Sequence, residues 1–132
     1  MPKNIYCHMN KWLALNQWFT SFGVKAYQEQ TVSETAVLPY IAYELAFGDI
    51  DNSPLALTFS YFERSKNWEG CYRMSETISA DIGRWGKRLT VDGGYIVIQR
   101  GSVFAQPLDD MDGDTDIRRM VFNIDVFFFT SN

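Results

Sequence analysis

Residues 117–129 read IRRMVFNIDVFFF, and apolar side chains alternate along nearly the whole stretch. One face carries Met120, Phe122, Ile124, Val126 and Phe128. The other face is mixed and carries Arg119, Val121, Asn123, Asp125 and Phe127. Period-two spacing over this length predicts a half-buried β-strand that is longer than average and completes the sheet. We expect its mixed face to be partly covered by another element or subunit.

The preceding sequence predicts two helices and six shorter strands. Helical spacing of apolar residues predicts helices over residues 4–22 and 67–85, with Trp12 and Trp85 in the buried stripes. Asn67 is a suitable N-cap, and Gly86 a suitable C-terminal stop. Alternation and turn residues predict strands over 24–27, 40–47, 55–62, 89–91, 95–100 and 103–106, with Gly101 ending the fifth.

A hairpin is expected to join strands 40–47 and 55–62, because a short polar loop connects them. The expected order of elements is α-β-β-β-α-β-β-β. This is an α+β fold in which two helices pack on one face of a mainly antiparallel sheet, as a single domain over residues 1–132.

Composition favours a folded domain that does not hold nucleic acid tightly. Hydrophobic residues make up 46% and aromatic residues 16% of the chain, which is ample for a core and raises the prospect of oligomer contacts. The net charge of −4 argues against a tightly bound phosphate backbone. With no apolar leader or membrane-length run, we expect synthesis in the cytoplasm and no membrane partner.

Residues with catalytic potential are few. Cys7 and Cys71 are expected on helices as free buried thiols. His8 is the only histidine, and neighbouring residues of a helix do not face each other, so Cys7 and His8 are a poor catalytic pair. We therefore expect no enzyme activity, no cofactor and no metal ion.

The densest polar feature is an acidic segment, residues 109–116, whose carboxylates are Asp109, Asp110, Asp112, Asp114 and Asp116. Its start resembles an EF-hand loop, but Ile117 stands where that loop needs glycine and Asn123 where it needs a bidentate glutamate. A solvated acidic loop that makes protein contacts is the better interpretation.

Nine of the twelve basic residues lie between Arg64 and Arg119. The members considered as a patch are Arg64, Lys66, Arg84, Lys87, Arg88, Arg118 and Arg119. Pairing of these charges with the acidic segment of the same or a neighbouring subunit is favoured over binding of nucleic acid. Complementary charges on opposite sides of a subunit would suit a head-to-tail ring.

Several segments, in this order, resemble the tail terminator (tail completion) proteins of long-tailed bacteriophages, which are also called minor tail or minor capsid proteins. The resemblance covers nearly the whole chain through diffuse patterns: PYIAY (39–43), GYIVI (94–98), FAQP (104–107) and DIRRMVFNIDV (116–126).

The resemblance implies a structural virion protein of the tail or neck. Such proteins form a hexameric ring on the tail tube, end tube growth and present a surface for head–tail joining. The implied partners are other copies of the chain, the tail tube protein and a head-side connector. From the charge we add that DNA would pass through an acidic lumen without specific binding.

Interface contacts are expected on the polar arm 28–35, the loop 48–54 and the acidic segment. The candidate interface residues are Asp109, Asp110, Asp112, Asp114, Asp116, Asp49, Asp51, Arg118 and Arg119. The alternatives are another neck or connector protein, such as a stopper or adaptor, and a small-ligand-binding α+β module.

Overall fold

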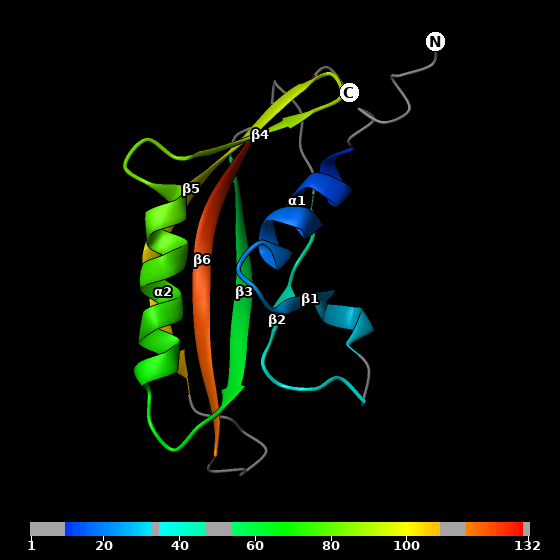
Figure 1. Cartoon of the computed structure of the whole chain (residues 1–132). Coiled ribbons are helices and arrows are strands. Elements are labelled where there is room, and N and C mark those ends of the chain that lie inside the picture. The colour runs from blue at the N-terminus through cyan, green and yellow to red at the C-terminus, as the bar shows by residue number, and fades with distance from the viewer. Residues whose placement is uncertain (1–9, 33–34, 47–53, 109–115, 131–132) are drawn as a thin grey trace.

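The last strand lies in the middle of the sheet, where it pairs on both sides (Figure 1). The computed structural model describes residues 10–32, 35–46, 54–108 and 116–130. The elements are α1 (Lys11–Thr20), β1 (Lys25–Gln28), the 3₁₀ helix η2 (Glu29–Thr31), β2 (Tyr40–Tyr43), β3 (Leu55–Arg64), α2 (Glu69–Ile82), β4 (Lys87–Val91), β5 (Gly94–Leu108) and β6 (Ile117–Thr130). Within the described residues the predicted α+β order is confirmed.

The sheet has six strands in the order β1-β2-β3-β6-β5-β4. β1 and β2 are parallel, and every other neighbouring pair is antiparallel. The predicted hairpin pairing of β2 with β3 is present. A mainly antiparallel sheet covered on one face is therefore the scaffold on which any functional surface must lie.

β6 has the alternation that its sequence predicts. Its inward side chains are buried: Met120, Phe122, Ile124, Val126 and Phe128. Phe122 stacks on Phe59 of β3 with ring centroids 4.8 Å apart, and Phe104 of β5 meets it edge-on. The alternate residues stay half-buried or exposed, so the two faces of the sheet differ sharply.

Both helices pack on the inward face. Trp18 and Phe19 of α1 contact Phe59, and Ile78 and Ile82 of α2 are buried in the same core. The Trp18 Nε1–H donates a 2.8 Å hydrogen bond to Asp81 Oδ2 of α2. This bond ties the two helices together over the sheet.

α1 is shorter than predicted. Asn10 is its N-cap, with Oδ1 accepting from the Leu13 N–H at 2.9 Å, so the helix begins at Lys11 rather than at residue 4. Residues 4–9, with Cys7 and His8, lie outside the described residues. Trp12 was predicted in the buried stripe and is 52% exposed, because the helix turns it away from the sheet.

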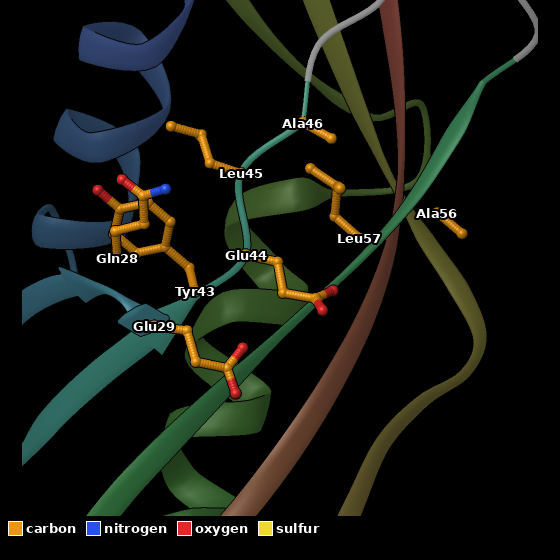
Figure 2. A pocket seen from close by; sticks show the side chains of 8 residues that line it. All are labelled: Gln28, Glu29, Tyr43, Glu44, Leu45, Ala46, Ala56 and Leu57. Carbon is orange, nitrogen blue, oxygen red and sulfur yellow. The ribbon is translucent and has the colours of Figure 1, made fainter. Parts of the chain in front are cut away.

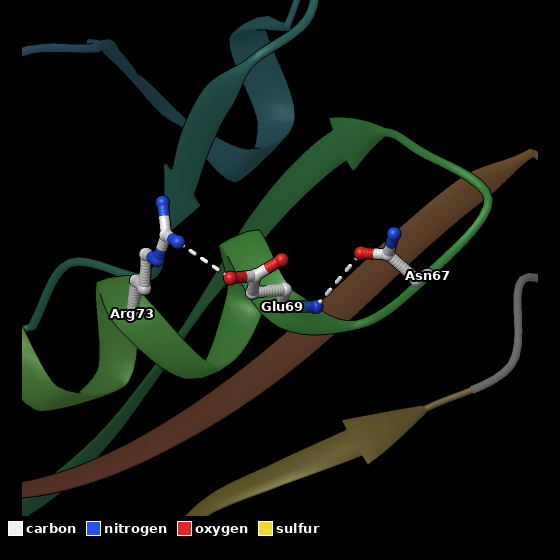
Figure 3. A network of polar contacts seen from close by, with 3 residues as sticks. All are labelled: Asn67, Glu69 and Arg73. Atoms are coloured by element: carbon white, nitrogen blue, oxygen red, sulfur yellow. Dashed lines mark hydrogen bonds and ion pairs between the residues drawn. The ribbon is translucent and has the colours of Figure 1, made fainter.

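α2 is also shorter than predicted, at both ends. The N-cap position is Trp68 rather than the predicted Asn67, although Asn67 Oδ1 accepts a hydrogen bond from the Glu69 N–H. Glu69 pairs with Arg73 one turn later (Figure 3). Gly83, with φ +72°, ends the helix three residues before Gly86. Trp85 therefore lies beyond the helix and is 82% exposed, which corrects its predicted burial.

Two strand predictions also change. β2 ends at Tyr43, short of the predicted residue 47. β5 runs through Gly101, where the sequence predicted a break, and absorbs the irregularity as a shift of register between Arg100 and Ala105. A Cβ at Gly101 would lie 2.9 Å from the Asn123 backbone oxygen, so glycine allows the close approach.

Two phenylalanines of β6 test this description of its faces. Replacing the fully buried Phe122 with alanine should lower the free energy of unfolding by about 3–5 kcal/mol, because it opens a cavity between Phe59 and Phe104. The matched change Phe129→Ala on the other face should cost about 1 kcal/mol. Denaturant unfolding measures both, and equal losses would contradict the two-faced strand.

Candidate interaction surface

Only part of the predicted interface is described by the structure. Asp116, Arg118 and Arg119 lie at the start of β6 and just before it. The other candidates lie outside the described residues: Asp49, Asp51, Asp109, Asp110, Asp112 and Asp114. The backbone oxygen of Asp116 accepts a 2.7 Å hydrogen bond from the Ser65 N–H, which holds the start of β6 against the end of β3.

Arg118 and Arg119 do not form one basic patch, because consecutive strand residues point to opposite faces. Arg118 lies on the helix side, where its Nη2 donates to the Lys66 backbone oxygen at 3.0 Å and its guanidinium lies over the Trp68 ring. Arg119 lies on the other side, where its Nε donates to Ser60 Oγ at 3.1 Å. The basic patch that the sequence analysis considered, and ranked below charge pairing, could therefore not include both residues on one face.

A buried polar cluster lies beneath the first turn of α2. The Tyr61 hydroxyl donates a 2.9 Å hydrogen bond to Glu63 Oε1, and the Glu63 carboxylate lies against Gly70, where a side chain would require that carboxylate to move. Burial, assisted by the Glu63 charge, raises the pKa of the Cys71 thiol to about 12 and also raises the pKa of Tyr61. Both groups stay protonated at neutral pH, so Cys71 is a packing residue and not a nucleophile.

The opposite face of the sheet, which we call the open face, has no helix packed on it among the described residues. At the middle of this face Asn123 is held from both sides. Its Oδ1 accepts from Thr58 Oγ1 at 3.2 Å, and its Nδ2 donates to the Val103 backbone oxygen at 2.7 Å. The bulged part of β5 thus partly covers β6, as the mixed outer face of the strand predicted.

One end of the open face carries a row of stacked rings. Phe127 and Phe129 are parallel with centroids 6.3 Å apart, and Phe129 stacks on Tyr95 at 5.1 Å. The Arg88 guanidinium lies 3.8 Å from the centre of the Tyr95 ring. The row therefore ends in a fixed positive charge.

A shallow hollow of about 450 Å³ opens beside this row. We call it the aromatic hollow, and the residues that line it are Trp85, Gly86, Arg88, Tyr95, Val97, Gln99, Phe127 and Phe129. Arg84 lies over the Trp85 ring at 5.3 Å, which adds a second guanidinium at the rim. Among the described residues, neither Arg84 nor Arg88 lies within ion-pair distance of a carboxylate.

Sequence reasoning missed the aromatic hollow. It placed Trp85 in a buried helical stripe, and it did not pair Tyr95 with Phe129. The available signal was the alternation of β6, which puts Phe127 and Phe129 on the outer face together. The register of β5 against β6 was needed to bring Tyr95 to the same place.

A second hollow, of about 330 Å³, lies beside the ends of β1 and β2 (Figure 2). Glu29 and Glu44 contribute exposed carboxylates, and Leu45, Ala46 and Leu57 supply apolar contacts. The Glu44 carboxylate already accepts from the Thr58 N–H at 3.2 Å. In the described part of the chain, no three His, Cys, Asp or Glu side chains are grouped to hold a metal ion.

No family model, no curated protein and no solved structure matches this chain. Among the described residues, no helix has the length and apolar character needed to cross a bilayer.

The buried Tyr61 predicts a loss of stability at alkaline pH. Its pKa is raised above the ordinary value of 10.0, so the unfolded chain releases this proton first and the free energy of unfolding falls as pH rises above about 10. The variant Tyr61→Phe should show a shallower fall, whereas Tyr72→Phe, at an exposed tyrosine of α2, should not. Unfolding curves from pH 8 to 12 measure this, and identical slopes for the two variants would contradict it.

Proposed function

We propose that this chain is a structural subunit of a phage virion, a tail terminator that forms a ring on the tail tube, stops tube growth and joins tail to head. The observation that carries the proposal is the open face. It presents a row of three aromatic rings that ends in Arg88, on a sheet whose other face is filled by two helices. Exposed aromatic surface with a polar rim is typical of protein–protein contact sites.

The segments behind the resemblance support the proposal because they are framework elements of this fold. The stretch 39–43 covers β2, and 94–98 and 104–107 are the two ends of β5. The stretch 116–126 begins one residue before β6 and covers most of it. The resemblance therefore concerns the elements that position the open face.

Charge supports a role beside passing DNA. A net charge of −4 gives no general attraction for phosphate, which suits a ring through which DNA slides. Hexamer stoichiometry, the tube protein and the head-side connector enter the proposal from the resemblance alone.

Coexpression with the tail tube protein encoded in the same genome tests the proposed function. In electron micrographs, tubes made with this chain should be shorter than tubes made without it and should carry it at one end only. A matched coexpression uses Phe122→Ala, whose disturbed core should prevent capping. Tubes of unchanged length that carry none of this chain at their ends would contradict the terminator and favour a stopper or adaptor.

A further inference from the structure

The aromatic hollow lies at the opposite end of the sheet from Leu108 and Asp116, the described residues that flank residues 109–115. Tyr95 faces Phe129 across the β5–β6 ladder, whereas Leu108 faces Arg119. The ten residue steps from Arg119 to Phe129 span roughly 33 Å at a rise of about 3.3 Å per residue. Figure 1 shows β4 beside the red end of β6, far from the orange start of that strand.

The acidic segment of a chain is too short to reach that chain's own hollow. It must leave β5 at Leu108 and reach Asp116, one residue before β6, eight residues later. A loop that goes out and back over eight residues extends about 14 Å at most, at no more than about 3.6 Å per residue. Contact between the two features is thus possible only between different copies.

The two features are chemically complementary. Residues 109–116 hold five aspartates and no basic residue. The aromatic hollow offers Arg88 fixed on Tyr95, Arg84 at the rim, and the exposed face of Trp85. A guanidinium held on a ring loses little freedom when it binds a carboxylate, and such sites favour bidentate pairing.

We propose that the aromatic hollow is the docking site for the acidic segment of a second copy of this chain. Because the two surfaces are different and lie at opposite ends of β6, the contact is head-to-tail and can repeat from copy to copy. This inference rests on the proposed function only for the expectation that the repeat closes into a ring on the tube.

A peptide assay tests the contact in isolation. A fluorescent peptide of residues 106–117 is titrated with the full chain carrying Asp109→Asn, Asp110→Asn, Asp112→Asn and Asp114→Asn. These substitutions neutralise the acidic segment of the full chain, so that it does not compete with the peptide for the hollow. Fluorescence anisotropy should show saturable binding at low salt that weakens as salt rises, because exposed charge pairs are screened.

The hollow variant, Arg84→Glu with Arg88→Glu, should weaken binding of the peptide at least about tenfold, which corresponds to about 1.4 kcal/mol. The matched control is Lys25→Glu with Arg73→Glu, which makes the same charge change at exposed positions outside the hollow and should leave binding unchanged. Circular dichroism confirms that both variants fold. Equal binding by the two variants, or no saturable binding, would overturn the inference, as would binding of a single-stranded oligonucleotide in preference to the peptide.

A mixing experiment tests the head-to-tail geometry. The hollow variant and the acidic-segment variant should each remain monomeric, because each lacks one half of the contact. Mixed at high concentration, they should form heterodimers and nothing larger, as measured by native mass spectrometry. Larger mixed assemblies would overturn the one-way contact.

The two experiments separate this inference from the proposed function. Peptide binding and heterodimers without tube capping would keep the contact and reject the terminator. Tube capping without peptide binding would keep the terminator and reject the contact.

Discussion

The packing of β6 between β3 and β5 is the constraint on which the rest of the structure depends. Phe122 is held between Phe59 on one neighbouring strand and Phe104 on the other, and both helices cover the face to which it points. A slip of one residue in either ladder would bring the outward set of β6, with Arg119 and Asp125, into the core. The register is therefore fixed by burial.

The same constraint determines what the open face presents. Because the inward residues of β6 are buried in the core, the alternate residues of this strand must face outward. The register between β5 and β6 then determines which residues of β5 lie beside them. Phe129 thus stacks on Tyr95 and lies parallel to Phe127, and Arg88 of β4 completes the row. An interaction surface follows from the alternation that builds the core, with no further element required.

Much of the fold could be predicted from local pattern, because periodicity reports burial directly. The order of elements and the faces of β6 belong to this part. Trp12 was misplaced because helical spacing alone does not say which side of α1 faces the sheet. Trp85 was misplaced because α2 ends at Gly83, before it. Less of the candidate site could be predicted. The alternation of β6 already implied that Arg118 and Arg119 lie on opposite faces, whereas the aromatic hollow depends on the register between strands. Six of the nine candidate interface residues lie outside the described residues.

The most direct test of this account is a cryo-electron microscopy reconstruction of the chain bound at the end of a tail tube. The account predicts a ring in which the aromatic hollow of each subunit, around Arg88 and Tyr95, is covered by residues 109–116 of its neighbour. A ring whose subunits turn the hollow to solvent, or a chain that binds no tube, would contradict it.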